Sequence, residues 1–372
     1  MTEDDRLYKI ALSLTPRVSA EIVRKLDDVA LTPRDFFTME TPALSEALGL
    51  RRSKGFEKMQ RDEALFNARR ELENVDNHHI RIYFLTDPDY PVRLMQIHDA
   101  PVVLYQLGNA DLDSRHIINV VGTRKPTPYG TAFTKDLVTD LAPYFPDLVV
   151  VSGLAYGIDA EAHSASIEAG VSTVAVVAHG LNMIYPAAHR DLARRILQKG
   201  GSIVTEYPFN TSPFKQRFLE RNRIIAGLSD VTVVAESDIR GGAMSTANTA
   251  FTYSRDVMAL PGRITDKLSS GCNYLLRKEK AHLITGAADL IELTGWKPLD
   301  LDIDTSSRNL FPELEGEAKI IYETLRYSKE PLQTDRIHAL TLIPLPRLMT
   351  TLGEMEFDGI VMRHPGNRYS AI

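Results

Sequence analysis

Apolar positions along the chain change their spacing near residue 78 and again near residue 295. Over residues 1–75 they recur at helical intervals, as in SAEIVRKLDDV and GFEKMQRDEALFNARRELE, without a strand-like run. This pattern predicts a small N-terminal α-helical domain over residues 1–75.

Residues 78–295 follow a different pattern, in which short apolar, β-branched runs alternate with helical segments. The runs are HIINVVGT, DLVVVSG, STVAVVA, SIVTE, DVTVVAE and DVMAL. Near-continuous apolar strands separated by helices are typical of a mostly parallel sheet that is covered on both faces. We therefore expect an α/β domain built on a doubly wound, mostly parallel sheet.

The last part of the chain departs from this alternation. Residues 296–315 are rich in Asp, Ser and Pro, a composition that predicts a solvated linker. Residues 316–372 contain three helical patterns, EAKIIYETLR, LQTDRIHAL and LPRLMTTLGEMEF, followed by a hairpin pattern around PGN. Three helices and a hairpin predict a C-terminal winged-helix-like module.

Composition limits the functions that this chain could have. The 372 residues include 43 Lys and Arg against 49 Asp and Glu, a net charge of −6, so nucleic-acid binding would need a local basic patch. The single cysteine, Cys272, excludes an intrachain disulfide and a Cys-rich zinc site, and it fits a reducing cytosol. No segment reaches the roughly 20 apolar residues of a membrane span. We expect a cytoplasmic protein without membrane contact.

Three glycine turns follow predicted strands, at the edge where doubly wound sheets bind ligands. They are VVGTRKPTPYG, VSGLAYGIDAEAH and RGGAMSTA, and in the last a helix is expected to begin near Ala243. Any one turn is equally compatible with a simple change of chain direction, but three in succession favour an anion site. None matches the Walker or dinucleotide-binding pattern, so we expect neither ATP hydrolysis nor a bound cofactor.

Asp159 and His163 lie four residues apart on a predicted helix and resemble half of a metal site. No third ligand accompanies them at a useful spacing. A helix-capping aspartate and a hydrogen-bonded core histidine are therefore favoured over a metal.

A basic cluster lies in SPFKQRFLERNRIIAGLS, where four cations oppose the single acid Glu220 and leave a local charge of +3; the cations are Lys215, Arg217, Arg221 and Arg223. Phe218 lies in the middle of this cluster. If the ring faces outward it can stack on a nucleobase, as in proteins that bind single strands without regard to sequence. Spacing alone leaves this reading and burial in the core equally open.

Six motifs, taken in order over residues 80–290, resemble those of the DNA-processing protein A family, also called DprA or Smf. They are GTRKPTPYG, SGLAYGIDAEAH, HGLNMIYP, TEYPFNTSPFKQRFLERNRIIAGLS, VVAESDIRGGAMSTANTA and ALPG. The resemblance implies an extended Rossmann-like domain, an N-terminal domain of the SAM or helix-hairpin-helix kind, and no enzymatic activity. It also implies a homodimer that binds single-stranded DNA and loads the RecA recombinase during natural transformation.

The resemblance places the DNA pocket at the glycine turns and the basic cluster, with Phe218 beside the bound strand. The candidate DNA-binding residues are Thr123, Arg124, Ser152, Gly153, Lys215, Arg217, Phe218, Arg221, Asn222, Arg223, Gly241, Gly242, Ser245 and Thr246. Some of the arginines are expected to hold the pocket together through carboxylates such as Glu206 or Glu236. Gly241-Gly242-Ala243 stands where many members have Ser-Gly-Ser, and the hydroxyls of Ser245 and Thr246 are candidate substitutes.

The outer domains carry weaker signals for DNA binding. The segment LSLTPRVSAEIVRKL lacks the glycines of a DNA-gripping helix-hairpin-helix, so a structural or regulatory role is favoured for residues 1–75. Residues 345–372 have no net charge, because three arginines oppose three acids: Arg347, Arg363 and Arg368 against Glu354, Glu356 and Asp358. A helix that reads DNA should be more basic, so protein contact is favoured for this module.

The strongest rival is a nucleotide-cleaving phosphoribohydrolase of the lysine-decarboxylase-like family, which has a related fold and a PGGxGTxxE motif. Such cleavage needs a carboxylate beside the sugar. GGAMSTANTA contains no acid, and Asn248 falls about where the glutamate should be. A non-catalytic nucleotide sensor would need only the three turns, and the basic cluster with Phe218 argues for a longer ligand.

Overall fold

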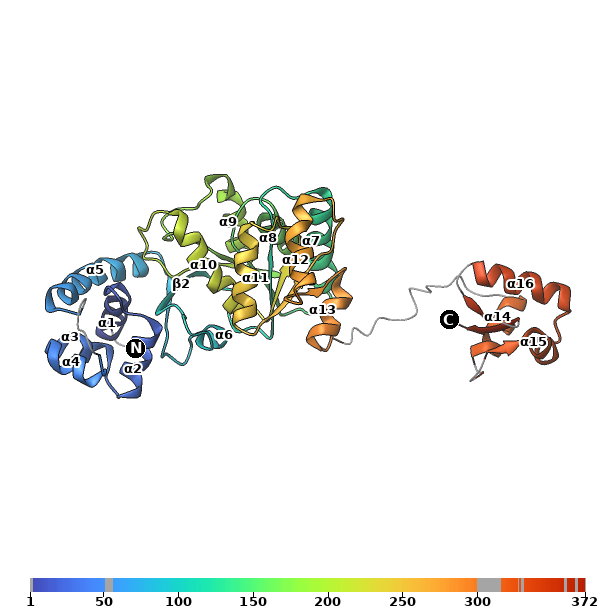
Figure 1. Ribbon diagram of the computed structural model, residues 1–372, viewed down its shortest axis with the longest axis horizontal. Coiled ribbons are helices and arrows are strands. Elements are labelled where there is room, and N and C mark those ends of the chain that lie inside the picture. Colours follow the sequence, from blue (N-terminus) through green and yellow to red (C-terminus); the bar gives the residue numbers. More distant parts are fainter. Residues whose placement is uncertain are drawn as a thin grey trace. The chain divides into compact units, whose positions relative to one another are not determined.

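The computed structural model describes residues 3–50, 56–299, 316–326, 328, 331–357, 360–364 and 367–371. The chain divides into two compact units, Met1–Leu299 and Asp300–Ile372. In Figure 1 the first unit runs from blue to orange and the second is red. The boundary that we predict near residue 75 falls inside the first unit and stays a prediction.

The described part of the first unit contains one sheet of nine strands in the order β1-β2-β6-β5-β4-β3-β7-β8-β9. The strands are β1 (Arg81–Phe84), β2 (Val103–Gly108), β3 (His116–Val121), β4 (Leu148–Ser152), β5 (Ser172–Val176), β6 (Ser202–Thr205), β7 (Val231–Val234), β8 (Asp256–Ala259) and β9 (His282–Leu283). Strands β3 to β9 pair in parallel, whereas β1 and β2 add an antiparallel edge at β6. The expected mostly parallel α/β sheet is confirmed.

Helices cover both faces of this sheet (Figure 1). They are α6 (Val92–Met95), α7 (Pro128–Leu141), α8 (Ile158–Ala169), α9 (Arg190–Gln198), α10 (Lys215–Leu228), α11 (Gly242–Thr252), α12 (Ser270–Arg277) and α13 (Ala287–Thr294), with short 3₁₀ turns at Ala187–His189 and Lys267–Ser269. A hydrophobic core lies on each face of the sheet, and strand β3 contributes side chains to both, because alternate side chains of a strand point to opposite faces. Ile118 and Val120 pack with α7, α8 and α13, whereas Ile117 and Val121 belong to the core that contains α10, α11 and α12.

In the described residues before the sheet there are five helices: α1 (Glu3–Leu14), α2 (Ala20–Asp28), α3 (Pro33–Thr38), α4 (Thr41–Ala47) and α5 (Lys58–Asn77). The described residues before β1 form no strand, as their apolar spacing predicts. Buried Glu71 of α5 accepts a hydrogen bond of 2.7 Å from the backbone N–H of Phe209, in the loop that leads to α10. The N-terminal helices therefore help to hold the loop before the basic cluster.

The described residues of the second unit form three helices and a small sheet. They are α14 (Gly316–Arg326), α15 (Thr334–Thr341), α16 (Leu345–Phe357), β10 (Leu332–Gln333), β11 (Val361–His364) and β12 (Arg368–Ala371), and the sheet has the order β10-β12-β11. Antiparallel β11 and β12 form the expected hairpin, with Asn367 in the left-handed region at φ 51°. Most of the predicted linker and Asp358 lie outside the described residues.

No helix in the described part of the chain combines the length and the apolar character that crossing a membrane requires.

Candidate nucleic-acid interface

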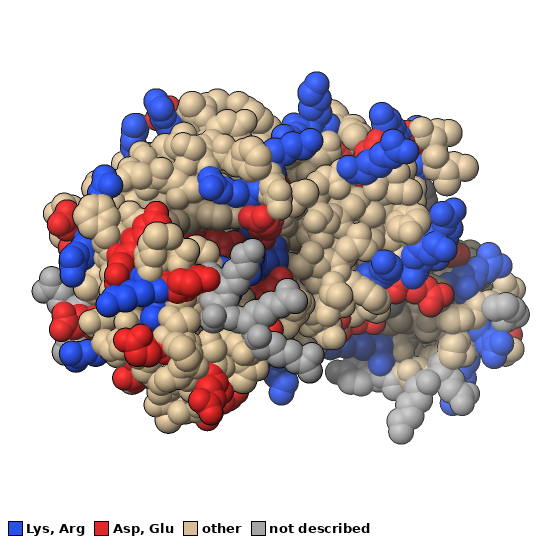
Figure 2. All heavy atoms as spheres, turned by 60° about the vertical axis from the view of Figure 1, so that its left-hand side comes forward, with Lys and Arg blue, Asp and Glu red and all other residues tan. Residues whose placement is uncertain are grey.

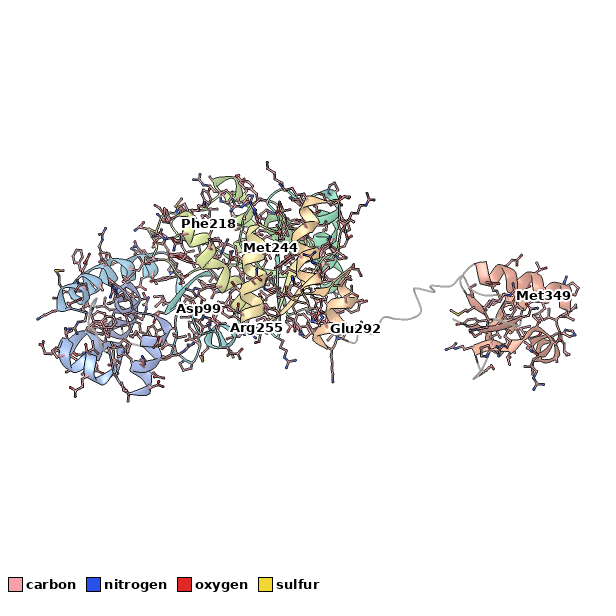
Figure 3. All side chains as sticks on the ribbon, viewed as in Figure 1. Asp99, Phe218, Met244, Arg255, Glu292 and Met349 are labelled. Carbon is pink, nitrogen blue, oxygen red and sulfur yellow. The ribbon has the colours of Figure 1, made fainter. Side chains whose placement is uncertain are left out.

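A cavity of about 320 Å³ lies beyond the carboxyl ends of β3 and β7. It is lined by Val121, Gly122, Thr123, Arg124, Ala155, Asp159, Phe218, Leu219, Arg221, Asn222, Ile225, Ser237, Asp238, Gly241, Gly242, Ala243 and Thr246. Figure 3 shows Phe218 on α10 and Met244 on α11, the helix that packs beside it. All three glycine turns and the basic cluster contribute to this one cavity.

The first turn presents an unpaired cation. The backbone N–H of Thr123 donates to the carbonyl of Glu236 at 2.6 Å, which ties the turn after β3 to the end of β7. Arg124 is exposed, and its guanidinium makes no hydrogen bond or ion pair with any described residue. A planar guanidinium left free in this way suits bidentate contact with a phosphate.

Asp159 stabilises the second turn, because its carboxylate accepts hydrogen bonds from the backbone N–H groups of Gly153 at 3.1 Å and Ala155 at 3.3 Å. Burial raises the pKa of Asp159, and the Arg221 guanidinium acts in the opposite direction. Gly157 has φ 80°, and a Cβ there would overlap the carbonyl of Thr123 in the first turn. A glycine is therefore needed where the two turns touch.

His163 is a core residue, as its spacing favours. It is fully buried, and its Nδ1 lies 2.7 Å from the hydroxyl of Thr173. Since that hydroxyl donates to the carbonyl of Val150, Nδ1 must carry the proton and donate. Burial lowers the pKa of His163 to about 3, so the ring is neutral at physiological pH. Among the described residues no three His, Cys, Asp or Glu side chains gather as metal ligands.

Ser152 and Gly153 shape the second turn and are absent from the described cavity wall. Ser152 is fully buried, and its hydroxyl donates to the carbonyl of Val120 at 2.7 Å. The Gly153 N–H is used by Asp159. Contact between these two residues and DNA stays a prediction.

Arg221 is a buried arginine that spans the sheet end. Only 4% exposed, it donates from Nη1 to the carbonyls of Gly153, at 2.7 Å, and Val176. A Cβ on Gly153 would lie 2.7 Å from its Nη2, so the glycine makes room for the guanidinium. Burial lowers the pKa of Arg221 to about 10, which leaves it charged at neutral pH. Arg221 thus ties α10 to the ends of β4 and β5, and its contact with DNA stays a prediction.

Arg223 and Arg217 also have partners within the protein. Arg223 forms an ion pair with Glu206 in which both side chains are mostly buried, as expected for an arginine that holds the pocket together. Glu236, the other carboxylate that we considered, instead accepts from the N–H and hydroxyl of Thr127 at 2.8 and 2.7 Å. Arg217 donates to the carbonyl of Ser212 and lies 5.2 Å from the ring centre of Tyr207.

The outer wall of the cavity carries the features expected of a strand-binding surface. Phe218 is half-buried, lines the cavity and belongs to none of the described hydrophobic clusters. Its ring centre lies 5.6 Å from that of Tyr185. The ring is therefore accessible, which removes the competing reading of burial in the core. Lys215 is exposed and makes no hydrogen bond or ion pair with a described residue, but it does not line the cavity, and neither do Arg217 and Arg223.

The third turn departs in part from expectation. Helix α11 begins at Gly242, one residue before Ala243. The cavity wall includes Gly241, Gly242 and buried Thr246 and omits Ser245, so of the two candidate substitute hydroxyls only that of Thr246 belongs to a lining residue.

Sequence reasoning missed Ser237, Asp238 and Leu219, which also line the cavity. Ser237 and Asp238 come directly after the apolar run DVTVVAE, so the rule that ligands bind at strand ends could have found them. The distribution of charge over the surface does not by itself mark the position of the cavity. On the face drawn in Figure 2, Lys and Arg are interspersed with Asp and Glu.

A doubly wound sheet with glycine turns, an unpaired arginine and an accessible ring around one strand-end cavity defines a Rossmann-like protein. Comparison with known families is more specific. The model of DNA recombination-mediator protein A matches residues 81–295, and that of the DprA winged helix domain matches residues 308–367. The chain belongs to the DNA recombination-mediator protein A family, as its six motifs predict.

Individual proteins are similar over most of the chain. Protein Smf of Synechocystis is 34% identical over 324 residues, 77% of this chain and 79% of that protein. DNA processing protein DprA of Streptococcus pneumoniae is 39% identical over 209 residues, 56% of this chain and 72% of that protein. The match to the curated Mycobacterium tuberculosis relatives, at 44% identity, spans only 50% of their length.

Two solved structures share the fold. DNA processing protein A from Streptococcus pneumoniae has a TM-score of 0.65 and 31% identity, with 78% of this chain and 98% of that chain covered. DNA processing protein A from Helicobacter pylori has a TM-score of 0.52 and 32% identity, with 58% of this chain and 97% of that chain covered. The Helicobacter pylori structure is described as giving insight into its single-stranded DNA binding mode.

Proposed function

We propose that this chain binds single-stranded DNA without regard to sequence, through the cavity at the carboxyl ends of β3 and β7. The observation that carries the proposal is that the unpaired cation Arg124 and the accessible ring of Phe218 line one cavity at the strand ends, with exposed Lys215 three residues before Phe218 on the same helix. Proteins that bind single strands commonly combine cations along the nucleic-acid backbone with aromatic side chains on which bases stack.

The cavity favours a single strand over a duplex. The cavity is small, about 320 Å³, and its wall is formed by the glycine turns, α10 and the start of α11. An unpaired base has free faces and edges that can enter such a recess, whereas the bases of a duplex are stacked inside the helix. Phe218 then serves as the platform for one base, and the flanking cations neutralise the adjoining phosphates.

Three cations are proposed to contact phosphates. Arg124 in the first turn and Lys215 on α10 are free to do so, and half-exposed Arg217 lies two residues after Lys215 on the same helix. Each contact on a single strand contributes roughly −0.7 to the slope of log affinity against log salt, so three predict a slope of about −2. Counting Arg221 as a fourth contact would predict about −3. The carbonyl bonds of Arg221 favour the smaller value.

We propose further that the protein acts in the cytoplasm as a homodimeric, non-enzymatic mediator that protects incoming strands and loads the RecA recombinase during natural transformation. Membership of the recombination-mediator family supports this role. Two subunits would place two cavities on one strand and raise avidity through effective concentration. Sedimentation that finds only monomers at micromolar concentration, with full DNA affinity, would remove the dimer from the proposal.

A nucleotide-cleaving enzyme of the lysine-decarboxylase-like family is not favoured. The position where its glutamate would lie is Asn248, whose amide donates to the carbonyl of Met244 and whose oxygen accepts from Lys280 at 3.0 Å. Asn248 is also absent from the wall of the cavity. A nucleotide sensor without catalysis is tested by the same titration as DNA binding.

The test is a titration of a single-stranded oligonucleotide, the matching duplex and mononucleotides across a salt series. We expect the single strand to bind most tightly, with a slope of about −2. A mononucleotide that binds as tightly as the oligonucleotide would favour the sensor. Equal affinity for duplex and single strand would contradict the proposed base platform.

A further inference from the structure

We propose that a bound single strand continues from the first cavity into a second one, where Tyr129 provides another base platform and Arg263 another phosphate contact. This inference rests on the proposed binding of single-stranded DNA and adds a subsite to it. The second cavity has a volume of about 870 Å³. Its wall consists of Thr127, Tyr129, Glu236 and the loop after β8, residues 261–263 and 265–268.

The two cavities are adjacent because the same two connections line both. Between the end of β3 and the first turn of α7, Thr123 and Arg124 line the first cavity, and Thr127 and Tyr129 line the second. In the connection from β7 to α11, Ser237 and Asp238 line the first cavity, whereas the preceding residue Glu236 lines the second. A strand that leaves the first cavity along either connection therefore reaches the second.

Tyr129 is an exposed ring that is already fixed in place. Its side chain is 51% exposed, and its hydroxyl donates to the carbonyl of Pro261 at 2.9 Å. A platform whose orientation is set before binding loses little conformational entropy when a base stacks on it.

The segments that line the two cavities are positive when they are taken together. Five exposed cations lie on these connections and on the loop after β8, namely Arg124, Lys125, Arg240, Arg263 and Lys267. The acids on the same segments are Asp238, Asp266 and Glu236, so five cations minus three carboxylates leave a charge of +2, whereas the wall of the second cavity alone has no net charge. Glu236 is buried, and Thr127 occupies both of its oxygens.

Arg263 is the cation best placed to meet a phosphate in the second cavity. It lines the wall, is exposed, and its guanidinium has no hydrogen bond or ion pair with a described residue. Lys267 lies on the same loop but pairs with Asp238 at 3.5 Å. A free guanidinium and a fixed ring in one recess repeat the combination of Arg124 and Phe218 in the first cavity, and this continuity favours the same polyanionic strand over a protein partner.

The experiment measures affinity for oligonucleotides of increasing length, from about 4 to about 16 nucleotides. Tyr129→Ala is expected to weaken binding of the longer oligonucleotides roughly five- to 100-fold and to leave the shortest unchanged. Tyr129→Phe keeps the ring and should bind like the unaltered protein to within a few-fold. Arg263→Ala is expected to reduce the salt slope by roughly 0.7 on the longer oligonucleotides only.

The outcomes separate this inference from the proposed function. If Phe218→Ala weakens binding at every length while Tyr129→Ala and Arg263→Ala bind normally, the second subsite is wrong and the first cavity stands. If the unaltered protein binds no single strand, the proposed function fails. If Tyr129→Ala changes the sedimentation of the protein and leaves DNA affinity intact, the surface is a protein interface and the inference is overturned.

Discussion

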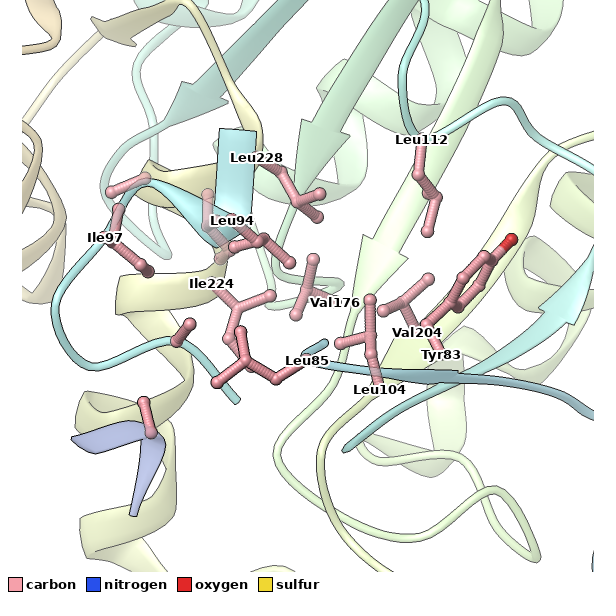
Figure 4. Packing of buried hydrophobic residues seen from close by; sticks show 14 of the residues in the cluster. Tyr83, Leu85, Leu94, Ile97, Leu104, Leu112, Val176, Val204, Ile224 and Leu228 are labelled. Atoms are coloured by element: carbon pink, nitrogen blue, oxygen red, sulfur yellow. The ribbon is translucent and has the colours of Figure 1, made fainter. Parts of the chain in front are cut away.

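The two halves of helix α10 differ in almost every physical respect, although they belong to one continuous helix (Lys215–Leu228). The first half, through Glu220, is exposed or half-exposed and carries Lys215 and Phe218. The second half is buried, and Ile224 and Leu228 pack with residues of β5, β6 and the α6 region (Figure 4). One end of the helix therefore lies at the surface beside the cavity, and the other anchors the helix to the sheet.

The division passes through the basic cluster itself. Lys215 and Arg217 lie in the accessible half, whereas Arg221 and Arg223 are held by carbonyls of the sheet ends and by Glu206. Arginine is suited to both tasks, because its planar guanidinium binds phosphate and buried acceptors equally well. Cations that look alike in the sequence thus divide into accessible ones, which we propose to bind a strand, and buried ones, which position the helix.

The largest expected effect comes from the buried half. Arg221→Met should lower the free energy of unfolding by about 3–5 kcal/mol, because it removes the charge opposite buried Asp159 and leaves two carbonyls without a donor. Urea denaturation measures the change. The matched control is Arg217→Met on the exposed half, which should cost less than about 1 kcal/mol. Equal losses of unfolding free energy in the two variants would contradict the division of α10 into a buried and an accessible half.

A smaller effect is expected from the accessible ring. Phe218→Ala should weaken binding to single-stranded DNA by about 1–3 kcal/mol, since one stacking platform is lost. The salt slope should not change, because the ring carries no charge. Fluorescence anisotropy across a salt series gives both quantities. Phe218→Trp keeps a platform and should bind within a few-fold of the unaltered protein. A changed slope in Phe218→Ala would mean that cations moved with the ring.

The smallest effect is expected from a single exposed cation. Lys215→Ala should make the salt slope shallower by roughly 0.7, with a modest loss of affinity at physiological salt. Stability should stay within about 0.5 kcal/mol, as is usual for a surface substitution. Lys199→Ala is the control. Lys199 is exposed and lies just before β6 begins, so it is at the amino end of that strand, whereas the cavity lies at the carboxyl ends of β3 and β7. If Lys199→Ala changes the salt slope and Lys215→Ala does not, the strand binds at another surface.

The sequence predicts the sheet and the three turns because local patterns determine them. Apolar runs mark β3, β4 and β7, and glycines mark the turns that follow. Since all carboxyl ends of a parallel sheet meet at one edge, the convergence of the turns follows from the pattern as well. The accessibility of Phe218 also agrees with the resemblance to the family, where spacing alone left it open.

The burial of individual cations could not be predicted, because distant residues determine it. Arg221 lies four residues after Arg217, which helical spacing places on the same face. Its acceptors, Gly153 and Val176, are 68 and 45 residues away in the chain. Ser152 presents the same difficulty: it ends a strand, but its hydroxyl turns to Val120 in the neighbouring β3. The local sequence around Arg221 and Ser152 does not indicate either of these contacts.

The most direct test of the proposed interface is photo-cross-linking of a single-stranded oligonucleotide that carries 5-iodouracil, with the modified residues identified by mass spectrometry. We predict cross-links at Phe218, with longer oligonucleotides also reaching Tyr129. Cross-links confined to the N-terminal helices α1 to α5 or to the C-terminal unit would contradict the account, because the strand would then bypass the cavity at the ends of β3 and β7.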